Sequence, residues 1–132
     1  MTKHLFSVLL IAFTTFSWSC KDQNQSVIEM VTAQEMMDLI AQFDYKLIDV
    51  RTPAEFESGT IEGCYNLDYL SDEFSTQVKN LDPTEPIIVF CKSGKRSSAC
   101  AKFLEKQGFV KIYNLEGGIT QWINLGLPLV LP

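Results

Sequence analysis

Short apolar runs alternate with amphipathic helical patterns along most of this chain, and this alternation constrains the fold more than any other feature. The runs are the expected strands and the periodic segments the expected helices. The clearest strand is the run Ile-Ile-Val-Phe at 87–90, which contains no polar residue and follows two proline-containing breakers. The other expected strands are 27–31, 46–50, 64–68 and 110–115.

The helical segments carry recognisable start signals. Thr32 and Glu35 form a capping-box pattern ahead of the first helix, and Pro53 suits the first turn of a short second helix. Three further helices are expected: one capped by Ser71, one over 97–107 and one within 117–126. Strands that alternate with helices predict an α/β fold. We expect a single domain with a central, mainly parallel five-stranded sheet and helices on both faces.

The first nineteen residues differ in composition from the rest. Lys3 and His4 precede an uncharged apolar stretch, 5–18, that is short for a membrane span and suits a secretory signal. Cys20 ends this stretch, which resembles a bacterial lipoprotein signal in which the cysteine is lipidated. A plain cleaved signal peptide is the alternative.

This N-terminal pattern predicts three parts of the chain. Residues 1–19 would be a signal peptide, residues 20–27 the lipidated Cys20 with a polar tether, and residues 28–132 the folded domain. The protein would then be anchored by lipid in the bacterial cell envelope, on the periplasmic or outer face.

Charge and histidine content exclude several classes of function. The formal net charge of −5 argues against nucleic acid as the main partner. Basic residues gather at one place, the loop cations Lys92, Lys95 and Arg96, which suggests a small anionic substrate. The only histidine, His4, lies in the expected signal peptide. The domain therefore lacks Cys-His and Ser-His dyads and histidine-based metal sites, and we expect no cofactor.

The chemistry is expected in the segment that follows the 87–90 strand. Ligand sites of parallel sheets lie beyond the carboxyl ends of the strands, where Cys91 falls. Gly94 permits a tight turn with inward-pointing backbone N–H groups before the next helix. These groups, the helix N-terminus and the loop cations can lower the pKa of the Cys91 thiol, so that a thiolate forms without a general base. Alternatively, Cys91 merely packs in a surface turn.

Three segments resemble single-domain rhodaneses, a family of sulfurtransferases. They are 47–67, 87–97 and 108–122, in the expected order within 28–129. The resemblance implies that Cys91 attacks the sulfane sulfur of an anionic donor such as thiosulfate and becomes a persulfide. The sulfur would pass to a thiol, a cyanide-like acceptor or a protein, without metal or organic cofactor.

The resemblance also assigns roles to neighbouring residues. The loop residues that would bind the donor are Lys92, Ser93, Gly94, Lys95 and Arg96. Asp49, Arg51, Glu55 and Ser97 are expected to support this loop, and the Glu116-Gly117-Gly118 segment is expected beside it. Thr60 and Cys64 depart from the family pattern, where His and Ala are common. We expect Cys64 and Cys100 to be buried apolar fillers, and the protein to be a monomer.

Three other functions remain open. Related dual-specificity phosphatases share this fold, but five residues separate their Cys and Arg, whereas four separate Cys91 from Arg96. The shorter loop favours a sulfur atom over a phosphoryl group. A sulfur carrier or protein-binding module without turnover is a second alternative. A thiol-redox protein that pairs Cys91 with Cys100 is the third.

Overall fold

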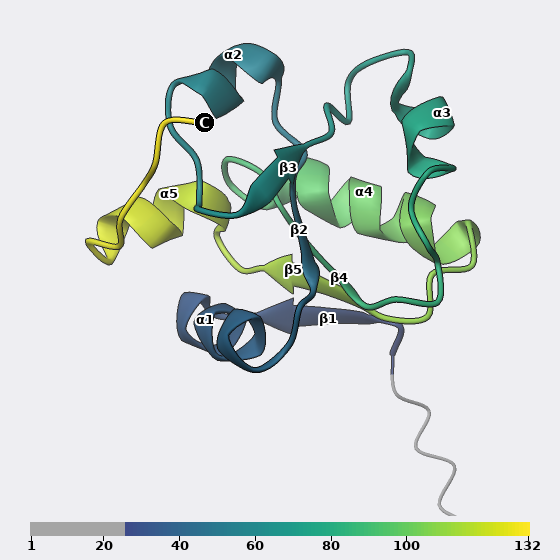
Figure 1. Cartoon of the computed structure of the whole chain (residues 1–132), viewed down its shortest axis with the longest axis horizontal. Helices are drawn as coiled ribbons and strands as arrows, with labels where there is room; N and C mark the ends of the chain where they lie inside the picture. The colour runs from purple at the N-terminus through teal and green to yellow at the C-terminus, as the bar shows by residue number, and fades with distance from the viewer. Residues whose placement is uncertain (1–25) are drawn as a thin grey trace, which may run out of the picture.

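A computed structural model describes residues 26–132; the expected signal peptide and Cys20 lie outside them. Five strands form one sheet in the order β1-β5-β4-β2-β3, and all neighbouring pairs are parallel (Figure 1). The strands are β1 Ile28–Val31, β2 Lys46–Asp49, β3 Cys64–Asn66, β4 Ile87–Phe90 and β5 Ile112–Leu115. The predicted single α/β domain is confirmed.

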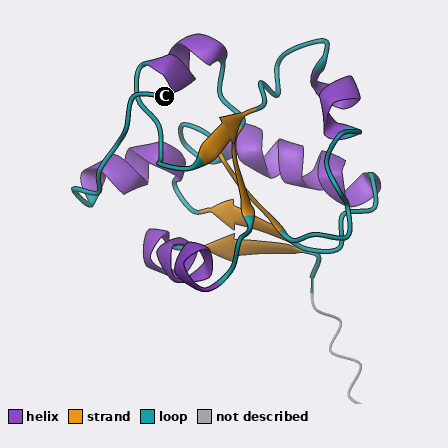
Figure 2. Cartoon of the chain, viewed as in Figure 1, coloured by secondary structure: helices purple, strands orange, loops and turns teal. Residues whose placement is uncertain are grey.

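Helices flank the sheet (Figure 2). They are α1 Ala33–Gln42, α2 Pro53–Glu57, α3 Phe74–Val78, α4 Lys95–Lys106 and α5 Gly118–Asn124. Residues of α1 and α5 contribute to one buried cluster, and residues of α3 and α4 to the other. Within residues 26–132, no helix is long and apolar enough to cross a membrane.

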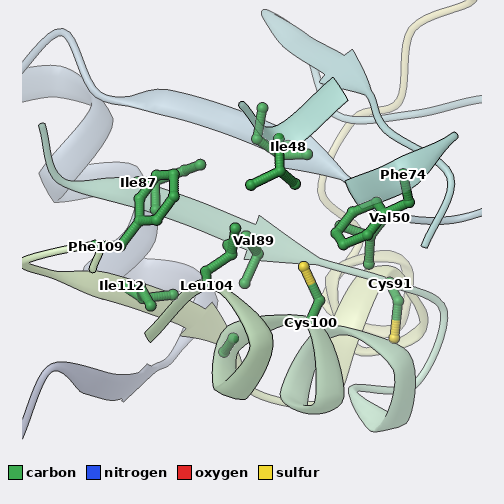
Figure 3. Packing of buried hydrophobic residues seen from close by; sticks show 12 residues of the cluster. Ile48, Val50, Phe74, Ile87, Val89, Cys91, Cys100, Leu104, Phe109 and Ile112 are labelled. Atoms are coloured by element: carbon green, nitrogen blue, oxygen red, sulfur yellow. The ribbon is translucent and has the colours of Figure 1, made fainter. Parts of the chain in front are cut away.

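Strand β4 lies between these two clusters, and all four of its residues are buried. Because side chains alternate along a strand, Ile87 and Val89 pack on the α4 side (Figure 3). Ile88 and Phe90 pack on the α1 side. Cys91 continues this alternation and lies with Val89 in the α4 cluster. The strand period thus delivers the Cys91 side chain to the start of α4.

Helix α4 begins two residues before the expected start at Ser97. Gly94 takes a left-handed conformation, with φ +98°, and its carbonyl accepts the first helical hydrogen bond from Ser98 N at 3.0 Å. A glycine adopts this conformation without steric penalty. The reversal at Gly94 therefore starts the helix early and keeps the preceding loop short.

Other boundaries also differ from the prediction, and β1, β2 and β3 are each one or two residues shorter than expected. Strand β5 begins at Ile112 rather than at residue 110. Ser71 is not the N-cap residue of α3, because that position is occupied by Glu73. The Ser71 hydroxyl instead accepts a hydrogen bond from the backbone N–H of Glu73 at 3.1 Å. Serine favours such local turns as well as helix caps, so its presence alone did not locate the helix start.

Candidate functional site

Cys91 follows β4 directly and is nearly enclosed, with 1% of its surface exposed. The chain turns over it, and Gly94 N donates a hydrogen bond to Cys91 Sγ at 3.1 Å. The sulfur therefore lies inside the turn that joins β4 to α4. This is the edge of a parallel sheet where ligand sites form.

The turn favours the ionised form of this thiol. Burial by itself raises the pKa of Cys91, but the nearby Ser97 hydroxyl and the backbone N–H groups of Ser97, Gly94 and Ser93 lower it further than burial raises it. The Ser97 hydroxyl donates to the Gly94 carbonyl at 3.2 Å in this structure, so it must rotate to donate to the thiolate. The net pKa lies below that of an ordinary thiol. These donors are all neutral, so hydrogen bonding rather than a general base stabilises the thiolate.

The three loop cations are not equivalent. Lys92 and Lys95 are exposed, whereas Arg96 makes a bidentate ion pair with Glu55 of α2. Arg96 Nη1 lies 2.7 Å from Glu55 Oε2, and Nη2 lies 2.8 Å from Oε1. The pair lowers the pKa of Glu55 to about 2 and raises the pKa of Arg96. Arg96 thus has a fixed partner before any substrate arrives.

Helix α5 supports the loop from the side opposite the thiol. Ile119 N donates to the carbonyl of Cys91 at 2.8 Å, and Thr120 N donates to the carbonyl of Lys92 at 3.0 Å. The first N–H groups of a helix have no partner within the helix and are free to do this. The start of α5, directly after Glu116 and Gly117, therefore lies beside the Cys91 loop, and these two hydrogen bonds join backbone atoms.

Comparison with known proteins identifies the family. The family model described as the rhodanese-like domain matches residues 32–125. The chain belongs to the rhodanese-like domain family. A sulfurtransferase of Allochromatium vinosum is 34% identical over 89 residues, which cover 67% of this chain and 81% of that protein.

Solved structures agree with this assignment. A rhodanese-related protein from Thermoplasma volcanium has a TM-score of 0.70 and 33% identity, with 79% of this chain and 99% of that chain covered. The polysulfide-sulfur transferase homodimer from Wolinella succinogenes has a TM-score of 0.65 and 31% identity, with 78% of each chain covered.

In this rhodanese-like domain, Asp49 and Arg51 form a buried ion pair with each other. Arg51 Nη2 lies 2.6 Å from Asp49 Oδ2 and also donates to the Gly59 carbonyl at 2.8 Å. Thr60 Oγ1 donates to the same Asp49 oxygen at 2.8 Å. The pair therefore joins the end of β2 to the segment that follows α2.

Cys64 takes part in the hydrogen bonding around Asp49 and Thr60, so it is more than the expected apolar filler. Its Sγ lies 2.9 Å from Thr60 Oγ1. Since the single Thr60 hydroxyl proton goes to Asp49, the Cys64 thiol is the donor in this contact. Burial raises the pKa of Cys64, which agrees with a protonated thiol. The two departures from the family pattern, Thr60 and Cys64, are thus hydrogen-bonded to each other.

Cys100 of α4 differs from Cys91 in environment and direction. It is 1% exposed, and burial raises its pKa to about 12. Both cysteines are free thiols, and their sulfur atoms point in opposite directions in the view of Figure 3. Of these two thiols, only Cys91 has the environment of a nucleophile.

Glu55 is one of the expected supporting residues, but the sequence around it does not identify its partner. The Thr52–Glu55 pattern does form a capping box, with Glu55 Oε2 accepting from Thr52 N at 3.1 Å. Nothing in that local pattern points to Arg96, which is 41 residues away. Within 26–132, no cluster of His, Cys, Asp or Glu side chains is arranged to hold a metal ion.

Proposed function

We propose that this protein is a sulfurtransferase that carries a sulfane sulfur on Cys91. The observation that carries the proposal is the Cys91 thiol itself, enclosed by hydrogen-bond donors that lower its pKa without a histidine. Such a thiolate is ready to attack a sulfur atom and needs no base to remove its proton.

The proposed reaction has two displacements. The Cys91 thiolate attacks the outer sulfur of thiosulfate, the sulfur–sulfur bond of the donor breaks, and sulfite leaves with the bonding electron pair. A thiolate or cyanide then attacks the outer sulfur of the Cys91 persulfide and restores the Cys91 thiolate. Backbone N–H groups of the loop, with Ser93 and Gly94, would hold the transferred sulfur and the charged end of the donor.

The relatives support this class of reaction. The names of the Allochromatium and Wolinella proteins describe a sulfurtransferase and a polysulfide-sulfur transferase. The exposed Lys92 and Lys95 add positive charge at the mouth of the loop, which suits an anionic donor. The four-residue interval between Cys91 and Arg96 supports a sulfur atom rather than a phosphoryl group as the transferred unit.

Intact mass spectrometry after incubation with thiosulfate, and in parallel with polysulfide, tests the proposal. We expect the added mass of one sulfur atom on the wild-type protein, and its removal by cyanide. The Cys91→Ser variant should remain unmodified, whereas Cys100→Ser should still gain the sulfur. An adduct that persists in Cys91→Ser would contradict the assignment of the nucleophile. An adduct that forms but cannot be discharged by acceptors would favour the carrier module.

A redox function is the second candidate, because Cys91 and Cys100 belong to the same buried cluster. The high pKa of Cys100 and the divergent sulfur atoms weigh against it. After mild oxidation, a disulfide that forms in the wild type and disappears in Cys100→Ser would favour redox chemistry.

We further propose that the domain works in the bacterial cell envelope as a monomer. The sequence of residues 1–19 suits an export signal, and Cys20 suits a lipid attachment site followed by a tether through residue 27. The acidic net charge supports a role without nucleic acid.

A further inference from the structure

Helix α5 lies close to the Cys91 loop at Gly118, which is buried and has φ +59°. A Cβ atom at this position would lie 2.5 Å from the Cys91 carbonyl oxygen. It would also lie 2.7 Å from the carbonyl carbon and oxygen of Lys92. These are backbone atoms, so the clash cannot be relieved by rotating a side chain. Any side chain at 118 must move either α5 or the loop.

The same contact sets the direction of the loop peptides. The carbonyls of Cys91 and Lys92 are bound to the N–H groups of Ile119 and Thr120. No peptide bond in the described part of the chain is cis, and in a planar trans peptide the N–H points opposite to the carbonyl. The N–H groups of Lys92 and Ser93 must therefore point away from α5.

This direction matters at the thiol, because the same turn carries the Gly94 N–H that donates to Cys91 Sγ at 3.1 Å, and the Ser93 N–H contributes to the lowered pKa of Cys91. We propose that Gly118 is a positioning residue for the Cys91 nucleophile: its missing side chain lets α5 hold two loop carbonyls and so turns the loop N–H groups to the opposite side. The inference rests on the proposed function only in taking Cys91 as the nucleophile.

Another glycine of α5's surroundings, Gly126, provides a matched control. Gly126, just beyond the other end of α5, has φ +73°, and a Cβ there would meet nothing within 4 Å. Alanine at either position has the same left-handed strain. Only Gly118→Ala adds a collision with the loop, so a difference between the two variants reports the contact rather than the strain.

The decisive measurement is the pH dependence of Cys91 alkylation by iodoacetamide, followed by peptide-resolved mass spectrometry from about pH 5 to pH 9. We expect Gly118→Ala to raise the apparent pKa of Cys91 by about one unit, which slows alkylation about tenfold below that pKa. Gly126→Ala should leave the pH profile unchanged. Equal shifts in both variants, or no shift in a folded Gly118→Ala, would overturn the proposal.

A second pair of variants covers the case in which Gly118→Ala does not fold, as judged by circular dichroism. Thr120 is exposed, so Thr120→Ala keeps the N–H donor to Lys92, and Thr120→Pro removes it. Thr120→Pro should raise the apparent pKa of Cys91 and Thr120→Ala should not; identical profiles would refute the positioning role. Alkylation does not require sulfur transfer. A protein that takes up no sulfur but shows these shifts would refute the proposed function and leave the role of Gly118 intact.

Discussion

At the scale of the residue, Cys91 shows how a thiol can ionise inside a folded domain without a basic partner. Its burial opposes ionisation, and the surrounding hydroxyl and N–H donors outweigh that opposition. Cys100 is also buried but has no such donors around it among the described residues, and burial raises its pKa to about 12. The contrast arises from backbone direction, because the turn at Gly94 aims N–H groups at only one of these sulfurs.

The Ser97 hydroxyl is the largest of the groups that lower the pKa of Cys91. We therefore expect Ser97→Ala to raise that pKa by about one unit, equivalent to about 1.4 kcal/mol lost from the thiolate. Alkylation of Cys91 at neutral pH should slow accordingly. Ser98→Ala is the control, since the Ser98 hydroxyl accepts a bond from Asn114 at 3.0 Å instead. A Ser97→Ala profile that overlays the wild type would contradict this role.

At the scale of the element, the loop is held from two directions. The Arg96–Glu55 pair ties the first turn of α4 to α2, and the N–H groups of α5 tie the loop carbonyls. Helix α2 contains only five residues and buries none of them. Because α2 buries no side chain completely, its capping box and the Arg96–Glu55 ion pair are important for holding this helix in position.

The Arg96–Glu55 pair predicts a pH-dependent stability. The pKa of Glu55 falls from 4.5 to about 2 on folding, so its contribution is complete above pH 4.5 and is lost as the pH falls toward 2. Because the side chains are partly exposed, we expect a loss of about 1–2 kcal/mol. Urea unfolding across this range should show a weaker acid dependence in Glu55→Gln, which can retain the capping box.

The exposed Glu57, on the same helix, provides the control for this prediction. Glu57→Gln should unfold with the pH dependence of the wild type. If Glu55→Gln and the wild type lose equal stability between pH 4.5 and pH 2, the pair does not stabilise the fold.

At the scale of the whole molecule, the sheet order places β4 between β2 and β5 with helices on both faces. The site therefore lies at the end of the most buried strand, and three separate segments converge on it: α2, the β4–α4 turn and α5. The N-terminus of the described chain leads into β1, which is one of the two edge strands of the sheet. An N-terminal tether would thus join the domain at an outer strand.

The proposed anchor predicts that cells expressing the full chain incorporate radioactive fatty acid into this protein. The label should require Cys20, because a lipoprotein signal places the lipid on that cysteine. Cys20→Ala should lose both the label and the membrane fraction, while Cys64→Ser should keep both. An unlabelled wild-type protein, or a labelled Cys20→Ala variant, would contradict the anchor.

The alternation of apolar runs and helical patterns was enough to predict the parallel α/β sheet, because burial on both faces requires that pattern. The sequence also placed Cys91 at the end of β4 and showed that the domain has no histidine. It could not show that Arg96 pairs with Glu55, or that Gly118 contacts the Cys91 loop. These contacts join residues distant in the chain, and local periodicity contains no information about them. Only the packing of α2 and α5 around the β4–α4 turn decided which charges are neutralised and which way the loop N–H groups point.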